Sequence, residues 1–123
     1  MTEEQFESLV YQAIKKLPQR FKSKLDNVDI VIQNFPNRHQ LLSLNLSHPF
    51  SLFGIYQGIP ITRRTSNYAF VPPDKITLFK KPIEYFFKTP EAIKTKIESV
   101  ILHEIGHHFG ISEQRMKNFP ITQ

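Results

Sequence analysis

The chain has 123 residues and no cysteine, so it can form neither a disulfide nor a thiolate-bound metal site. This length is enough for one domain with a hydrophobic core and too short for two. Apolar residues make up 40% of the chain, but no apolar stretch is long enough to cross a bilayer. The first residues, Met1 to Glu4, are acidic, unlike a secretory signal, and we therefore expect a cytoplasmic protein.

The formal net charge at pH 7 is +5, with a sequence pI near 9.6. Such a charge attracts acidic peptides or phosphates at low salt. The basic residues are spread along the chain rather than gathered in one run, which favours a solvated surface over a nucleic-acid site. We therefore expect neither a nucleic acid nor a membrane as partner.

A first helix is predicted near the start of the chain. Thr2 and Gln5 have the spacing of a capping box, in which two side chains bind backbone N–H groups at the start of a helix. Apolar residues follow at helical spacing as far as Leu17, and Pro18 then ends the pattern. The sequence predicts an amphipathic helix here.

Strand patterns follow the first helix. Residues 28–32 are rich in branched side chains and predict a β-strand. Residues 41–46 are a weaker candidate for a second strand, and residues 34–40 are expected to form the loop between the two.

The middle of the chain is interrupted by turn-forming residues. Gly54, Gly58 and a proline break up the apolar residues of segment 48–60, which we interpret as a loop. Residues 76–80 give the clearest later strand pattern, and residues 83–87 are expected to form a short helix.

A long helix is predicted over residues 90–109. Thr89 supplies a capping hydroxyl, and Pro90 stands at the first helical position, where its missing N–H is not needed. Apolar residues occupy a broad arc, so much of the helix is expected to be buried. Gly110 suits the left-handed conformation that often ends a helix, and Ser112 is placed to begin a short final helix.

The most specific pattern lies at the end of this long helix, where His103, Glu104 and His107 form the motif H-E-x-x-H. Histidines four positions apart project from one helix face and can bind one Zn²⁺. Glu104 is turned about 100° from His103, so it is placed to act as a base on a nearby water rather than as a ligand. The alternatives are a chance pair of surface histidines and an ordinary helix glutamate.

A third ligand is expected just after the helix. Glu113 lies six residues beyond His107 with Gly110 between them, which gives the order H-E-x-x-H-x-x-G-x-x-E. This is the metzincin spacing with an acid in place of the third histidine. Glu113 is therefore a candidate zinc ligand, although an acid that caps a final helix is a competing interpretation. His108 points about 100° away from His107, and we interpret it as a packing residue or as a residue that supports a metal ligand, rather than as a ligand itself.

Several stretches together resemble the small bacterial zincin-like metallopeptidase family, long known only as a domain of unknown function. They include PDKITLFKKPIE at residues 73–84, the capped helix with the following residues to 116, and the loop LFGIYQGIPI at residues 52–61 with Arg63. The resemblance covers most of residues 52–116.

The resemblance implies a minimal zincin-like fold with Zn²⁺ on His103, His107 and Glu113, and with Glu104 as the base. We expect one α+β domain over residues 1–123, in which a small twisted mixed sheet packs on the helix that carries the motif. An N-terminal helix and a short C-terminal helix complete the expected fold.

The predicted reaction is hydrolysis of a peptide bond by zinc-bound water, in an acidic or unfolded segment of a peptide or protein substrate. We interpret residues 76–80 as the edge strand beside which the substrate lies, flanked by Lys80 and Lys81. A metal-dependent ribonuclease and a non-catalytic zinc-binding module are the alternatives. Neither alternative requires a carboxylate at Glu104.

Overall fold

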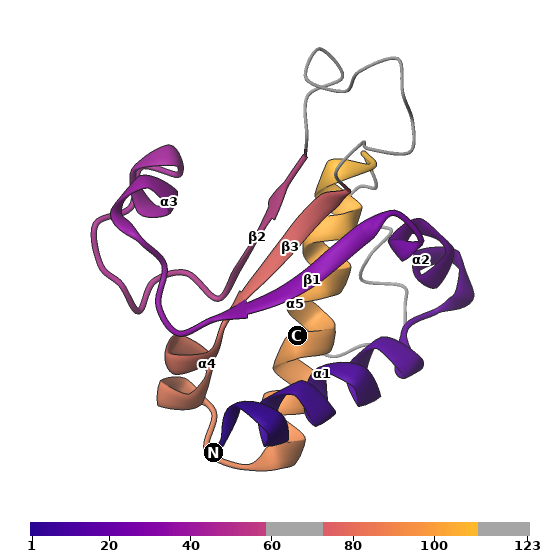
Figure 1. Cartoon of the computed structure of the whole chain (residues 1–123), viewed down its shortest axis with the longest axis horizontal. Helices are drawn as coiled ribbons and strands as arrows, with labels where there is room; N and C mark the ends of the chain where they lie inside the picture. The colour runs from indigo at the N-terminus through magenta and orange to yellow at the C-terminus, as the bar shows by residue number, and fades with distance from the viewer. Residues whose placement is uncertain (59–72, 111–123) are drawn as a thin grey trace.

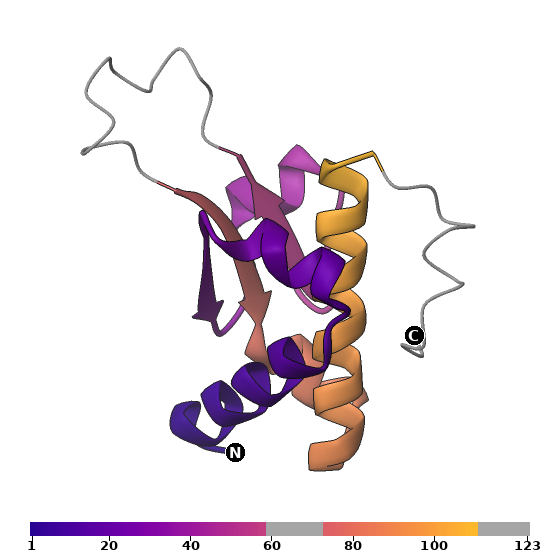
Figure 2. The same cartoon turned by 90° about the vertical axis from the view of Figure 1, so that its right-hand side faces the viewer.

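The computed structural model describes residues 1–58 and 73–110 of the chain. These residues form a three-stranded mixed sheet with helices around it, and the long helix α5 covers one face of the sheet (Figures 1 and 2). The α+β architecture expected from the sequence is confirmed. The predicted short C-terminal helix lies outside the described residues.

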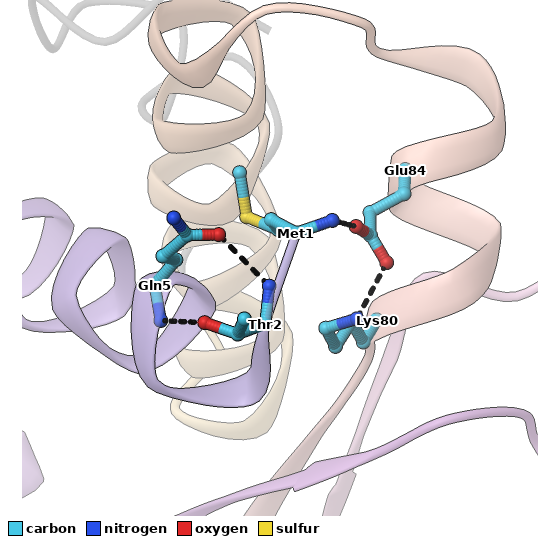
Figure 3. Close-up of polar contacts among 5 residues, drawn as sticks. All are labelled: Met1, Thr2, Gln5, Lys80 and Glu84. Carbon is cyan, nitrogen blue, oxygen red and sulfur yellow. Dashed lines mark hydrogen bonds and ion pairs between the residues drawn. The ribbon is translucent and has the colours of Figure 1, made fainter.

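Helix α1, Glu3–Lys16, begins at the predicted capping box. The side chain of Thr2 accepts the N–H of Gln5 at 3.1 Å, and Gln5 Oε1 accepts the N–H of Thr2 at 2.9 Å (Figure 3). The buried face of α1 packs mainly on α5. The chain then continues through α2, Gln19–Lys22, and a 3-10 turn, Ser23–Leu25.

The sheet has the strand order β1-β3-β2. Strand β1, Val28–Gln33, runs parallel to β3, Asp74–Phe79, whereas β2, Gly54–Gln57, runs antiparallel to it. The strand prediction at 28–32 is confirmed, and so is that at 76–80 except for Lys80, which begins the next helix. The interpretation of 76–80 as an edge strand is wrong. Strand β3 pairs on both sides, and its last four residues are buried, as is typical of a central strand.

Two further predictions for the middle of the chain are wrong. Residues 41–46 are not a strand, because helix α3, Arg38–Ser43, begins within the expected loop and includes half of the segment. Asn37 and Gln40 form a second capping box, with the Gln40 N–H donated to Asn37 Oδ1 at 2.7 Å. The expected loop at 48–60 contains β2.

Helix α4, Lys80–Phe86, confirms the predicted short helix but begins three residues earlier. Lys80 is only 4% exposed, and its Nζ lies 2.8 Å from Glu84 Oε1. The N-terminal amine of Met1 lies 2.8 Å from the other oxygen of the same carboxylate (Figure 3). Lys80 is therefore neutralised inside the fold, and the expectation that it flanks a substrate cleft is wrong.

Helix α5, Pro90–His108, confirms the predicted long helix. The Thr89 side chain accepts the N–H of Ala92, and the chain after the helix turns at Gly110, whose φ is 74°. Much of the helix is buried against α1 and the sheet, which fixes its direction and the position of its last two turns. Within residues 1–58 and 73–110, no helix is long and apolar enough to cross a membrane.

Candidate active site

The two histidines of the motif lie on one face of α5. Their ring centroids are 5.8 Å apart and the ring planes are inclined by 80°. Two imidazoles that share a zinc with N–Zn distances of about 2.0–2.1 Å have centroids roughly 5 to 6 Å apart. His103 is half-buried and His107 is exposed, so the pair faces the surface of the molecule. The two side chains fit a zinc ion.

The third ligand predicted from the sequence lies beyond the described part of the chain. Glu113, Ser112 and Arg63 all belong to residues that the structure does not describe. Among residues 1–58 and 73–110, no group of three His, Asp or Glu side chains is placed to hold a metal ion. The role of Glu113 stays a prediction.

Glu104 lies beside the histidine pair and is held by the neighbouring strand. Its Oε1 accepts the backbone N–H of Tyr56 in β2 at 3.0 Å. Burial raises the pKa of the Glu104 carboxyl, while the Tyr56 N–H and the imidazoles of His107 and His103 act in the opposite direction. Burial has the largest influence, so the pKa lies above its ordinary value and the carboxylate is a stronger base than an exposed one.

The hydrogen bond to Glu104 depends on the close approach of β2 and α5 at Gly54. A Cβ atom at this position would lie 2.5 Å from Val100 Cγ1 and 3.1 Å from the Thr77 carbonyl oxygen. Only glycine fits between the helix and the central strand without displacing one of them. Gly54 was one reason to interpret this segment as a loop. In the structure, the same glycine allows β2 to come close enough to α5 to bind Glu104.

Glu104 also lines two hollows in the surface. The larger, of about 640 Å³, lies between α3, β2 and the end of α5, and His39 and His107 are also in its wall. The smaller, of about 270 Å³, extends along α5 in the other direction and includes His103. Leu52 and Gly54 line both hollows, so the two share a boundary at Glu104.

A ring stack joins β2 to the last turn of α5. The rings of His108 and Tyr56 lie 3.9 Å apart and are nearly parallel, at 17°. The Tyr56 hydroxyl donates to Asp74 Oδ2 at 2.8 Å, and His108 Nε2 lies 3.8 Å from the same oxygen. The packing role expected for His108 is confirmed, and the stack helps to hold the Tyr56 N–H in front of Glu104.

Sequence reasoning missed the contribution of β2. The atom of Tyr56 that reaches Glu104 belongs to the backbone, so no side-chain motif indicates it. The available signal was the pair Ile55 and Tyr56, a branched and an aromatic residue of the kind that favours strands. His39 was assigned to a loop, whereas it lies in α3 and lines the larger hollow.

Comparison with known families gives a match over most of the chain. A family described as zincin-like metallopeptidase matches residues 25–120, which include all three strands, α5 and the H-E-x-x-H motif. A comparison with curated proteins gave no match. The chain belongs to the zincin-like metallopeptidase family.

Proposed function

We propose that the protein is a zinc-dependent peptidase in which Glu104 acts as the general base. His103, His107 and Glu113 are the proposed zinc ligands. The observation that supports this proposal most strongly is the position of Glu104. Its carboxylate is held by the Tyr56 N–H beside the histidine pair, at the boundary between two hollows that can receive the two sides of a peptide chain.

A bound Zn²⁺ supplies a Lewis acid that polarises the peptide carbonyl and lowers the pKa of a water. Glu104 takes the proton of the attacking water and passes it to the nitrogen of the leaving amine as the C–N bond breaks. The hydrogen bond from Tyr56 engages Oε1, so Oε2 is the oxygen assigned to this transfer.

Zinc binding can be tested separately from catalysis. We expect one zinc per chain in protein purified without a His tag, measured by elemental analysis. His103→Ala and His107→Ala should each lose the metal, because one imidazole of the pair is removed. Glu113→Gln should bind zinc more weakly, because the metal loses its proposed anionic ligand. Unchanged affinity in Glu113→Gln would favour the helix-cap interpretation instead.

The catalytic role is tested by the isosteric change Glu104→Gln. We expect this variant to keep its zinc and its fold but to lose peptide hydrolysis by about 10²-fold or more, the usual scale for a positioned general base. A proteomic cleavage screen in zinc-replete buffer measures the loss. Glu91→Gln is the matched control, because it makes the same chemical change at an exposed position of α5, outside both hollows.

The outcomes separate the proposed function from its alternatives. Equal cleavage by wild type and Glu104→Gln would show that Glu104 is not the base. Zinc binding without cleavage by either protein would favour a non-catalytic zinc-binding module. Cleavage of RNA that depends on Glu104, with no cleavage of peptides, would replace the peptidase by a ribonuclease.

A further inference from the structure

The smaller hollow beside Glu104 contains a positive charge. Lys96 is the one lysine or arginine among its described lining residues. Its Nζ lies 4.7 Å from the ring centroid of Phe53, which also lines the hollow, and 5.5 Å from that of Phe87. Two aromatic rings therefore hold the ammonium group in place at the wall of the hollow.

Lys96 differs from two other shielded lysines in having no carboxylate partner among residues 1–58 and 73–110. The Lys96 side chain is half-buried, and this burial lowers the pKa of its ammonium group. Lys80 and Lys94 are more deeply buried than Lys96, and each has a carboxylate partner. Lys80 Nζ lies 2.8 Å from Glu84, and Lys94 Nζ lies 3.3 Å from Glu91. Within the part of the chain that the structure describes, no carboxylate forms an ion pair with Lys96. An anion that entered the hollow would meet a partly desolvated cation.

The position of Lys96 on α5 relates this cation to the proposed reaction centre. Lys96 precedes His103 by seven residues, so the two share nearly the same helix face and are separated by about 10 Å along the axis. An extended peptide advances about 3.3 Å per residue. A substrate lying along this face would therefore bring a side chain about three residues from the cleaved bond close to Lys96.

Proximity to an aromatic ring does not by itself distinguish Lys96. Lys15, Lys24 and Lys88 also lie over aromatic rings, at 4.5, 4.6 and 5.2 Å from the centroids. None of these three lines either hollow at Glu104. The combination of a fixed cation, a hollow and a shared helix face is what sets Lys96 apart.

We propose that Lys96 determines specificity by binding a carboxylate of the peptide substrate about three residues from the cleaved bond. This inference rests on the proposed peptidase function. It assigns a preference for acidic peptides to Lys96 rather than to Lys80, whose charge is already matched by Glu84. The carboxylate belongs either to an Asp or Glu side chain or to the C-terminus of a short peptide, and the two sources are separable by experiment.

The experiment uses randomised peptide libraries in zinc-replete buffer, with the C-terminus either free or amidated. We expect wild type to favour Asp and Glu over Asn and Gln at one position, by roughly 5- to 20-fold in kcat/KM. Lys96→Met should lose this preference through a higher KM for acidic peptides, and Lys96→Glu should favour Lys or Arg at that position. Cleavage confined to free C-termini, at a constant distance from the end, would identify the terminal carboxylate as the source.

Lys15→Met is the matched control, because it removes one positive charge and one ring contact on α1. It should keep the wild-type preference. The same positional preference in wild type and Lys96→Met would overturn the proposal, as would an equal loss in Lys15→Met. Folding of each variant is checked by thermal denaturation. If Lys96→Met fails to fold, Lys96→Arg and Lys96→Glu replace it: Lys96→Arg keeps the charge and should retain the preference for acidic peptides, whereas Lys96→Glu should lose it.

A binding measurement keeps this proposal separate from the proposed function. Anisotropy of a labelled peptide rich in Glu, compared with its Gln counterpart, is recorded on Glu104→Gln protein, which is expected to bind without cleaving. Weaker binding of the Glu peptide after Lys96→Met supports the carboxylate site even if no variant cleaves any peptide. Equal affinity of the two peptides for both proteins overturns it.

Discussion

Glu84 and Glu104 are two shielded carboxylates with opposite surroundings. Glu84 lies in α4, at the lower end of the sheet in Figure 1, and each of its oxygens lies 2.8 Å from a cation, Lys80 or the N-terminal amine (Figure 3). Burial raises the pKa of Glu84, but the hydrogen bonds from these two cations outweigh it and the pKa is lowered. Glu104 lies in the last turns of α5, and its carboxylate accepts the backbone N–H of Tyr56. Burial has the largest influence on its pKa, which is raised.

The comparison shows how a structural carboxylate differs from one available for chemistry. The negative charge of Glu84 is balanced within the fold and therefore stabilises the folded state. The charge of Glu104 is balanced less completely, which makes folding less favourable but leaves the group able to accept a proton. Both carboxylates are shielded from water, so shielding alone does not distinguish the stabilising carboxylate from the one that can accept a proton. The number of cations beside each carboxylate does distinguish them.

The largest change in stability is expected from Gly54→Ala, which disturbs the surroundings of Glu104 without altering a charge. The new methyl group would lie 2.5 Å from Val100 Cγ1, so either the Val100 side chain must repack or β2 and α5 must move apart. We expect the free energy of unfolding to fall by about 1–3 kcal/mol, the usual cost of overpacking. Urea denaturation measures this change.

Gly58→Ala is the control for this substitution. A methyl group at Gly58 would have its nearest neighbour, Cε1 of His108, at 3.4 Å, an ordinary contact distance. We expect a change within about 0.5 kcal/mol for the control. Equal stability of the Gly54→Ala and Gly58→Ala proteins would show that β2 and α5 are not in close contact at this point.

Glu84→Gln is expected to have the next largest effect. Lys80 is buried and loses its anionic partner, so the free energy of unfolding at pH 7 should fall by roughly 1–2 kcal/mol, allowing for partial exposure. Because the pKa of Glu84 is lowered in the folded state, its contribution is complete above its ordinary value of 4.5 and is lost as the pH falls through the lower, folded-state value. The difference between variant and wild type should therefore shrink on acidification.

Glu91→Gln provides the matched control for Glu84→Gln. It breaks the 3.3 Å contact with Lys94, but the Glu91 side chain is 81% exposed. Such exposed pairs contribute little, and we expect a change below about 0.5 kcal/mol. An effect of Glu84→Gln no larger than that of Glu91→Gln would contradict the stabilising role assigned to Glu84.

The smallest effect, of opposite sign, is expected from Glu104→Gln in zinc-free protein. A raised folded-state pKa means that stability is lost as the pH rises through that value. Replacing the carboxylate by an amide removes this loss, so the variant should be more stable than wild type at pH 7, by about 1 kcal/mol or less. The difference in free energy of unfolding between Glu104→Gln and wild type should vanish well below pH 4.5, where the Glu104 carboxyl is protonated. A Glu104→Gln protein less stable than wild type at pH 7 would show that Glu104, like Glu84, stabilises the fold through its charge.

The helices show which local signals could be read from the sequence. The capping box of Thr2 and Gln5 was recognised, because a long amphipathic pattern follows it. The equivalent box of Asn37 and Gln40 was overlooked, because α3 has only six residues and its leucines also suit a strand. The capping pattern was the better guide there, since it depends on specific side-chain geometry rather than on hydrophobicity.

The site was predictable where it depends on one helix and not where it depends on contacts between elements. The spacing of His103 and His107 follows from helix geometry alone, and the structure places both rings on one face. The pairing of Lys80 with Glu84 was missed, because residue 80 was assigned to a strand, where four-residue spacing does not bring two side chains together as it does in a helix. The Tyr56 N–H and the rings around Lys96 come from distant parts of the chain, which only the fold brings together.

The most direct test of the role of Glu104 is a crystal structure of the zinc-loaded protein, with the metal located by its anomalous scattering. We expect zinc bound by nitrogen atoms of His103 and His107, with Glu104 outside the set of ligands and still accepting the N–H of Tyr56. Coordination of the zinc by the Glu104 carboxylate, or zinc bound away from the two histidines, would contradict this account.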